Sequence, residues 1–319
     1  MKKAAWIFVA GTALGAAIGA KAVSDFRREQ RIALAILRGR SQIIDTACGP
    51  IEYASVGEGP AVLMIHGAAG GYDQGLELAC VFSLDRFKLI SVSRPGYLRT
   101  PLSSGQTPQA MADLYAALLD ALNVRGVAIA GVSAGGPSSL QFALRHPDRC
   151  WGLIMVSAVN QTLPTLPPTV RWLQPVFNYS SFGTWLLNKL AWRLLVSLLG
   201  VSPELMNRIE REPDKIRTIR NLLEVSTTLD FRRAGIFNDI DTLTGLPLAP
   251  VEHIRVPTLV IHSPTDPLVP YAQGRMLAGR IPGAKLVAVA EGGHLCVVTN
   301  SEQVAPDLFE FLTRHARHP

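Results

Sequence analysis

Three residues whose types can together cleave an acyl bond follow one another along the chain: Ser133, Asp266 and His294. A serine hydroxyl is a poor nucleophile until a base takes its proton, and a neutral histidine is such a base near neutral pH. A carboxylate beside the histidine sets its tautomer and stabilises the imidazolium that forms. The trio therefore predicts nucleophilic acyl transfer, provided that the fold brings these distant positions together.

Ser133 lies at the centre of a G-x-S-x-G string, residues 131–135, which follows an apolar run at 126–130 and precedes a helix-like stretch. A strand that turns so tightly into a helix holds its serine in a strained backbone conformation with the hydroxyl projecting. The same string also occurs in ordinary strand-to-helix turns. We interpret it as a nucleophile elbow because the other two residues of the trio accompany it.

A loop of small residues, 66–71, follows a predicted buried strand upstream of the serine. Acyl transfer builds negative charge on the carbonyl oxygen, and removing one N–H donor that stabilises this charge costs about 2.7–4 kcal/mol of barrier. The predicted donors are the backbone amide of Ala134 and that of Ala68, with Ala69 as the alternative on the same loop. We interpret His66, at the strand end, as a structural hydrogen-bonding residue and not as the base.

Two further predicted strands position the carboxylate and the imidazole. Asp266 follows the apolar run 256–263 in a turn, and His294 follows the run 284–290 on a glycine-containing loop. The carboxyl ends of neighbouring parallel strands meet at one edge of a sheet, where open α/β folds bind their ligands. We therefore expect both side chains at the edge that carries Ser133.

The order Ser, Asp, His is that of the α/β-hydrolase family, which the sequence resembles from about Cys48 to its C-terminus. Residues 91–97, after a predicted strand, also resemble a family loop, although Leu98 stands where many members have glycine; we interpret this loop as scaffold. The resemblance implies an α/β fold with a mainly parallel central sheet, helices on both faces and an inserted helical lid. Strands that alternate with helical stretches agree with it.

The resemblance also implies a role for each site residue. Ser133 is the nucleophile, His294 the general base and then acid, and Asp266 the carboxylate that orients it; Ala68 and Ala134 donate to the oxyanion. Relatives that open carbon–halogen bonds or epoxides use an aspartate at the elbow, so the serine argues against those activities. Esterases, lipases, thioesterases, carbon–carbon bond hydrolases, haloperoxidases and acyltransferases all stay open, since the triad does not separate them.

Regular alternation of strands and helices stops between residues 160 and 250, where we predict the lid. An apolar helix at 182–195 carries several aromatic residues, and a lid over the serine favours an apolar acyl or alkyl group in the substrate. We predict that Trp185 and Ala69 bind substrate; the alternative is that the aromatic residues only pack the lid onto the core. The charged stretch 204–233 reads as a solvated helical face.

The N-terminus carries two lysines and an apolar run at 4–20, followed by an Ala-Lys-Ala sequence suited to cleavage. The run fits a signal peptide or a short membrane anchor. Basic residues beyond it oppose export, so we favour a membrane-associated enzyme over one exported to the periplasm or outside, and leave the side of the membrane open. Residues 26–37 fit a basic helix along the membrane surface or a plain solvated linker helix.

These patterns divide the chain into four parts. They are a signal peptide or anchor at 1–22, a basic amphipathic linker helix at 23–47, the hydrolase core at 48–159 and 251–319, and the lid at 160–250. The net charge of +6 is concentrated in the N-terminal forty residues, so nucleic-acid binding has no support. The four cysteines lack metal-binding spacing, and no dinucleotide or phosphate-loop motif is present, so no metal and no cofactor is implied.

The sequence therefore predicts a membrane-associated serine hydrolase that cleaves an apolar carboxylic ester, a small molecule, through an acyl-enzyme. A carbon–carbon bond hydrolase of ring-cleavage products with the same triad is the first alternative. A low-turnover ligand-binding receptor of the same fold is the second. The oligomeric state and the identity of the ester stay open.

Overall fold

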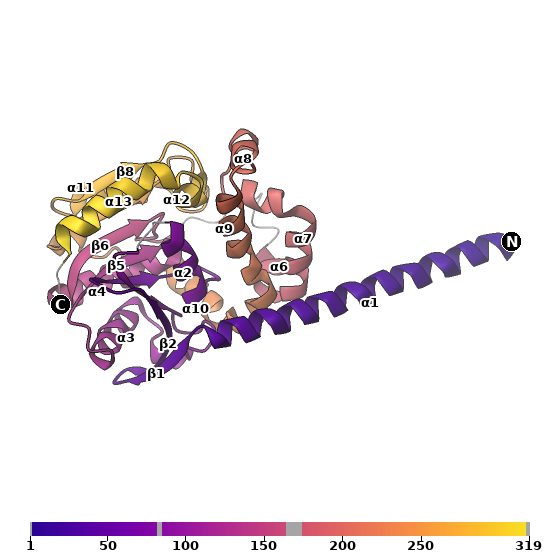
Figure 1. The fold of residues 1–319 in the computed structure, drawn as a ribbon, viewed down its shortest axis with the longest axis horizontal. Coiled ribbons are helices and arrows are strands. Elements are labelled where there is room, and N and C mark those ends of the chain that lie inside the picture. Colours follow the sequence, from indigo (N-terminus) through magenta and orange to yellow (C-terminus); the bar gives the residue numbers. More distant parts are fainter. Residues whose placement is uncertain (1, 82–84, 164–173, 317–319) are drawn as a thin grey trace.

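The computed structural model describes residues 2–81, 85–163 and 174–316 of the 319-residue chain. A twisted central sheet with helices on both faces forms the body, and one long helix, α1 (Lys2–Gly39), runs past the body and extends beyond it toward the N-terminus (Figure 1). The C-terminal part of α1 lies along the body and contacts it. The predicted fold class is confirmed.

The sheet has eight strands in the order β1-β2-β4-β3-β5-β6-β7-β8. The pairs from β4 through to β8 are parallel, whereas β1 and β2 join the sheet edge as antiparallel strands. The strands are β1 (Gln42–Thr46), β2 (Gly49–Val56), β3 (Ala61–Ile65), β4 (Lys88–Val92), β5 (Val127–Val132), β6 (Cys150–Val156), β7 (Thr258–His262) and β8 (Lys285–Ala288). The parallel strands β3, β5, β6 and β7 are buried on both faces, as their nearly continuous apolar runs require, whereas the edge strand β8 is partly exposed.

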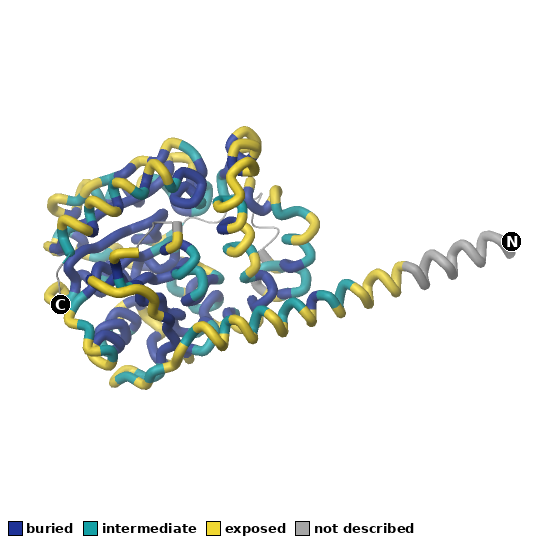
Figure 2. The backbone as a smooth tube through the Cα atoms, in the orientation of Figure 1, coloured by how far each residue is buried: buried dark blue, intermediate teal, exposed yellow. Residues whose placement is uncertain are grey.

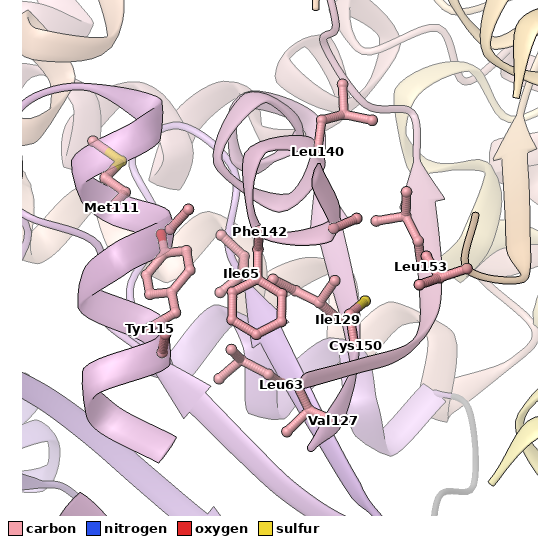
Figure 3. Packing of buried hydrophobic residues seen from close by; sticks show 14 of the residues in the cluster. Leu63, Ile65, Met111, Tyr115, Val127, Ile129, Leu140, Phe142, Cys150 and Leu153 are labelled. Carbon is pink, nitrogen blue, oxygen red and sulfur yellow. The ribbon is translucent and has the colours of Figure 1, made fainter. Parts of the chain in front are cut away.

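The helices divide between the two faces of the sheet. One face is covered by α3 (Pro108–Ala121), α4 (Gly136–Arg145) and α11 (Tyr271–Arg280), and the other by α2 (Tyr72–Val81), α12 (Cys296–Thr299) and α13 (Ser301–His315). Figure 3 shows the first face, where Leu63, Ile129 and Leu153 of three strands meet Tyr115 of α3 and Phe142 of α4. These side chains are fully buried, and the sheet appears as the buried centre of the body in Figure 2.

Between β6 and β7 the described chain is helical, and we refer to this part, residues 174–244, as the insert. It comprises α6 (Gln174–Tyr179), α7 (Ser181–Leu198), α8 (Pro203–Ile209), α9 (Pro213–Leu223), the 3₁₀ segment η4 (Glu224–Phe231) and α10 (Arg233–Thr244). Its charged stretch is not solvated throughout as predicted, because Arg232 is fully buried and pairs with Asp73 of α2 at 2.8 Å. The insert is therefore tied to the core by charge as well as by apolar packing.

The N-terminal prediction requires correction. Among the described residues no helix is long and apolar enough to cross a membrane, so the predicted membrane-associated or exported location is wrong, and so is the anchor on which it rested. The run at 4–20 is rich in alanine and glycine, which contribute little to transfer into lipid, and charges follow it at Lys21 and Asp25. The side chains of residues 1–14, which include the first part of this run, lie outside the described ones.

The segment between that run and the core also differs from the prediction. One continuous helix reaches Gly39, and the chain then forms the β1–β2 hairpin, where the sequence analysis extended a linker helix to residue 47. The helix is not a free linker either, because Phe26 is buried between Phe182 and Trp185 of α7, with ring centroids 5.6 Å from both. The β-branched residues at 43, 44 and 46 are the sequence signal that a strand prediction could have used.

Candidate active site

The turn between β5 and α4 holds Ser133 in a left-handed conformation, with φ of 49°. A non-glycine residue with positive φ is strained, and such strain persists only where the surroundings impose it. Here α4 crosses directly over the end of the strand: a Cβ on Gly131 would lie 2.5 Å from the Ser139 hydroxyl oxygen. The G-x-S-x-G string therefore forms the predicted strand–turn–helix, with Ser133 at its apex.

The structure brings Ser133, His294 and Asp266 into one hydrogen-bonded chain. The Oγ of Ser133 lies 3.0 Å from Nε2 of His294, and Nδ1 of the same ring lies 2.8 Å from Oδ2 of Asp266. Ser133 follows β5, Asp266 follows β7 and His294 follows β8, so all three stand at the carboxyl edge of the parallel strands. The side chain of Asp266 is fully buried, and that of His294 is 14% exposed.

Asp266 is held as a carboxylate by its surroundings. Its Oδ1 accepts hydrogen bonds from the backbone N–H groups of Leu268 at 2.9 Å and Val269 at 3.0 Å, and its Oδ2 also lies 3.4 Å from Nε2 of His262. Burial by itself raises the pKa of this carboxyl, but the two histidines and the backbone donors outweigh burial and bring the pKa well below its ordinary value. The carboxylate is thus charged and fixed in orientation throughout the neutral range.

The predicted oxyanion loop lies beside the serine. A Cβ on Gly67 would stand 3.1 Å from the Cβ of Ser133, and the loop turns back on itself through a hydrogen bond from Gly70 N to Gly67 O. Ala68, at the tip of the turn, is exposed, and Ala69 is half-buried with φ of 57°. The backbone of this turn therefore lies next to Ser133, and the assignment of the Ala68 and Ala134 amides as oxyanion donors stays a prediction.

His66 is fully buried and makes two hydrogen bonds away from the serine. Its Nε2 accepts from the backbone N–H of Arg94 at 2.9 Å, and its Nδ1 lies 2.7 Å from the carbonyl of Gly67, so the ring is a neutral Nδ1–H tautomer. Burial, and then the neighbouring Arg94, holds the pKa of His66 well below its ordinary value. Its geometry is that of a structural hydrogen-bonding residue.

The sequence analysis overlooked how closely the insert approaches the histidine. The backbone N–H of His294 donates to the carbonyl of Leu199 at 2.7 Å, directly after α7. The next residue, Gly200, has a φ of 93°, and a Cβ there would stand 2.8 Å from the Cα of Gly293. Backbone therefore packs on backbone at this point, a contact that a search for chemically reactive residues does not find.

Trp185, a predicted substrate-binding residue, lies on the side of the insert that faces α1. Its indole N–H donates to Glu29 at 2.9 Å, and its ring packs against Phe26 and Phe182. The Nζ of Lys189 lies 5.8 Å from the centre of the same ring. The described contacts of Trp185 are therefore with α1 and its own helix. Ala69, the other predicted substrate-binding residue, lies on the loop at 66–71, and its contact with substrate stays a prediction.

Comparison with known proteins places this geometry in a family. A family profile described as the alpha/beta hydrolase fold matches residues 60–301, a range that holds Ser133, Asp266 and His294, the loop at 66–71 and the insert. The chain belongs to the α/β-hydrolase family. The solved structure of an alpha/beta hydrolase fold protein from Nakamurella multipartita superposes on this hydrolase with a TM-score of 0.77 at 33% identity, covering 85% of this chain and 98% of that one.

Curated relatives of the hydrolase agree with this assignment. An uncharacterized hydrolase of Bacillus subtilis, YcgS, is 27% identical over 81% of this chain and 93% of its own length. A poly(3-hydroxyalkanoate) depolymerase of Ectopseudomonas oleovorans is 29% identical over 66% of this chain and 70% of its own length. The predicted resemblance is thus confirmed, and the protein is a hydrolase of this fold; α1 and the β1–β2 hairpin lie outside the matched family range.

Proposed function

We propose that this hydrolase cleaves a carboxylic ester that carries an apolar acyl or alkyl group, through a covalent acyl-enzyme on Ser133. The observation that carries the proposal is the chain of hydrogen bonds from Ser133 Oγ through His294 to Asp266. Nucleophile, base and orienting carboxylate are within hydrogen-bonding distance of one another, which is the geometry that this chemistry needs.

In the acylation step, the Oγ of Ser133 attacks the ester carbonyl carbon while Nε2 of His294 takes the hydroxyl proton. The Asp266 carboxylate, which stays ionised, stabilises the imidazolium that forms. Backbone N–H groups of Ala68 and Ala134 donate to the oxygen of the tetrahedral intermediate, where negative charge develops. When the intermediate collapses, the C–O bond breaks and His294 returns the proton to the leaving alcohol, which leaves the acyl group on Ser133.

The deacylation step repeats this sequence with water. His294, neutral again, takes a proton from a water molecule as the water oxygen attacks the acyl carbonyl, and it then protonates the Oγ of Ser133 as the acid product leaves. No metal or cofactor takes part in either half, because the enzyme supplies the nucleophile, the base and the donors from its own chain.

Apolar side chains next to the elbow support an apolar substrate group. Ala134 packs in one buried cluster with Val159 and Val269 of the core and with Leu243 of α10 and Leu246 just after it. Apolar surface that lies beside the reacting carbonyl favours alkyl chains over charged or strongly polar groups. A relative named as a depolymerase of poly(3-hydroxyalkanoate), a polymer joined by ester bonds, supports ester chemistry.

The insert and the strand-rich core act as two units in this proposal. The core at 48–159 and 251–319 supplies the triad and both oxyanion amides, and the lid at 160–250 closes over them. The hydrogen bond that the N–H of His294 donates to the insert carbonyl of Leu199 supports this division, because a lid must reach the site that it covers. Part of the predicted lid, residues 164–173, lies outside the described residues. We propose that the lid selects the acyl group, with Ala69 at the rim of its pocket.

The test measures hydrolysis of p-nitrophenyl butyrate and octanoate and covalent labelling by a fluorophosphonate. Under the proposal, the wild-type protein turns over many times on both esters, gives a burst of p-nitrophenol and is labelled on Ser133. Ser133→Ala removes the nucleophile, so turnover falls by about 10⁶-fold and labelling disappears, while the circular-dichroism spectrum and melting temperature stay close to those of the wild type. Labelling that persists in Ser133→Ala would exclude Ser133 from the proposed role.

The two alternatives give different results in the same assays. A carbon–carbon bond hydrolase would leave simple esters nearly untouched and cleave a ring-cleavage dienoate, which is therefore assayed in parallel. A receptor of this fold would show at most one slow turnover for each molecule of protein. Sustained ester turnover with no cleavage of the dienoate supports the esterase proposal over both.

A further inference from the structure

The oxyanion loop is held by a buried arginine that the proposed chemistry does not use. Arg94, directly after β4, donates from Nε to the carbonyl of His66 at 3.0 Å and from Nη2 to the carbonyl of Gly67 at 3.1 Å. Its own backbone N–H donates to the His66 ring. Arg94 is 1% exposed, so these hydrogen bonds form away from water and hold both carbonyls that precede Ala68.

The charge of Arg94 is balanced from the insert. Asp239 of α10 accepts both guanidinium nitrogens, Nη1 and Nη2, at 2.7 Å each, in the paired geometry that suits a guanidinium and a carboxylate. The hydroxyl of Tyr97 donates to the same carboxylate. Both Asp239 and Tyr97 are buried, so removing the carboxylate charge leaves a buried guanidinium without its counter-ion.

Tyr97 brings the same carboxylate into contact with the other side of the loop. Its ring meets the ring of His66 edge to face, with centroids 4.7 Å apart, and it packs with Ala69. Asp239 therefore reaches both sides of the loop through one intermediate side chain each, through the hydrogen bonds of Arg94 at residues 66–67 and through the packing of Tyr97 on Ala69.

The helix that carries Asp239 is itself docked rigidly on the loop that carries Arg94. The backbone N–H of Gly235 donates to the carbonyl of Gly96 at 2.9 Å, and that of Leu98 donates to the carbonyl of Phe231 at 2.7 Å. Because backbone hydrogen bonds fix the two segments directly, the position of Asp239 relative to Arg94 does not depend on flexible side chains. The loop at 91–97 therefore acts as more than scaffold.

We infer that Asp239 of the insert is a positioning residue for the oxyanion hole: through Arg94 and Tyr97 it holds the 66–69 turn, so that the Ala68 amide points at the reacting carbonyl. The inference rests on the proposed function, because it assigns a role in that same site. It makes the insert part of the structure that stabilises the transition state, in addition to its role as a cover. Asp239 itself touches no reacting atom.

The physical consequence is a selective loss of transition-state stabilisation. A displaced amide binds the ground-state carbonyl nearly as well as before but meets the developing oxyanion poorly, so kcat falls while KM changes little. Misplacing a catalytic group by about 1 Å lowers the rate on the order of 100-fold, which is somewhat less than the loss on removing the donor altogether. For Asp239→Asn we expect kcat on p-nitrophenyl butyrate to fall by about 10- to 100-fold, with KM within about threefold of the wild-type value.

A matched control separates positioning from simple loss of stability. Asp73 forms a second carboxylate–arginine pair between core and insert, with Nη1 and Nη2 of the buried Arg232 at 3.1 and 2.8 Å, although the side chain of Asp73 is itself 27% exposed. Arg232 donates its remaining hydrogen bond to Thr228 and none to a carbonyl of the loop. Asp73→Asn takes the counter-ion from the buried Arg232, so it should lower the melting temperature and leave kcat within about twofold. Urea denaturation of Asp73→Asn and Asp239→Asn measures how much unfolding free energy each of them loses.

Tyr97→Phe provides a second variant that keeps the Arg94–Asp239 pair and removes only the hydroxyl. It should fold even if Asp239→Asn does not, and it should lower kcat by about 10-fold, again with little change in KM. An equal loss of kcat in Asp73→Asn and Asp239→Asn, or wild-type kcat in both Asp239→Asn and Tyr97→Phe, would overturn the inference. Absence of ester turnover by the wild-type protein would instead refute the proposed function, so the two failures are distinguishable.

Discussion

The insert contacts both ends of the candidate site, but it does so through different forces. At the histidine loop it presents backbone to backbone: Leu199 accepts from the N–H of His294, and Gly200 packs on Gly293 without a side chain between them. At the oxyanion loop it presents a buried charge, Asp239, to the guanidinium of Arg94. One end is thus fixed by shape and the other by electrostatics.

The difference shows why the two ends respond to different changes. Close packing of backbone tolerates almost any alteration of charge but no added methyl group, because interiors are packed as densely as crystals. A buried ion pair tolerates small changes of shape but not the loss of one partner, which leaves an uncompensated charge. Four predictions test this comparison, from the largest expected effect to the smallest.

The largest effect is expected for Asp266→Asn, at the histidine end. The backbone N–H groups of Leu268 and Val269 would hold the amide oxygen of the new side chain, which turns its NH₂ group toward Nδ1 of His294. The imidazole would then carry its proton on Nε2 and could not accept one from Ser133. We expect kcat for p-nitrophenyl butyrate to fall by about 10⁴-fold with little change in KM. Near-normal kcat would show that another group orients the histidine.

The second prediction tests whether close packing fixes the histidine loop. It compares two glycines that both have a positive φ. Gly200 and Gly283 have φ of 93° and 73°, but a Cβ on Gly283 would meet nothing within 4 Å, whereas one on Gly200 would meet the Cα of Gly293 at 2.8 Å. Both alanine variants should lose about 1–2 kcal/mol of unfolding free energy to backbone strain. Only Gly200→Ala should also lower kcat, by about 10-fold, because it displaces the histidine loop.

Steady-state kinetics and urea denaturation of the two variants decide this point. If Gly283→Ala loses as much activity as Gly200→Ala, backbone strain alone explains the effect and the histidine loop is not fixed by packing.

The third prediction concerns the electrostatic end and its dependence on pH. His66 is neutral when folded, with a pKa well below the ordinary value, since burial and Arg94 oppose its cation. The unfolded chain therefore takes up this proton first, and the free energy of unfolding falls as the pH drops below about 6.5. Between pH 6.5 and 5 the loss should be about 1–2 kcal/mol. Glutamine does not titrate, so His66→Gln should lack this part of the pH dependence of the unfolding free energy. Urea denaturation of both proteins at several pH values measures the difference.

The smallest effect on activity is expected on the far side of the insert, where α1 packs. Phe26→Ala removes a buried ring that packs against Phe182 and Trp185 and should cost about 3 kcal/mol of stability, at the low end for a buried phenylalanine. Because α1 touches neither end of the site in the described contacts, kcat and KM should change less than twofold. A large change in KM would mean that Trp185 reaches the substrate pocket, as the sequence analysis predicted.

Local sequence patterns predicted the sheet edge well. The strand expected at 61–65 is β3, and those expected at 256–263 and 284–290 contain β7 and β8. Short apolar runs that end in turns containing glycine or proline carry this information, because strands inside a parallel sheet bury both faces. From the order of these strands and of Ser133, Asp266 and His294 along the chain, the contact among the three side chains could be anticipated.

Local patterns failed where a residue's partner is remote in the sequence. The segment at 23–47 was predicted to be a linker helix, because the local sequence cannot show that the helix buries Phe26 against the insert. Arg232 was assigned to a solvated face, because the sequence around it is charged and its partner Asp73 lies far upstream. In both cases the local composition was read correctly and the tertiary contact reversed its meaning.

The sequence by itself determined the reactive groups, the turn that strains Ser133 and the strands that end beside it, since these depend on neighbours along the chain. Only the tertiary structure decided how the site is held. The carbonyls of the oxyanion loop need donors, and the buried guanidinium that supplies them needs a counter-charge; both needs are met by Arg94 and Asp239, which are 145 residues apart. No local pattern encodes that pairing, because the energy of a buried charge depends on what the whole fold places around it.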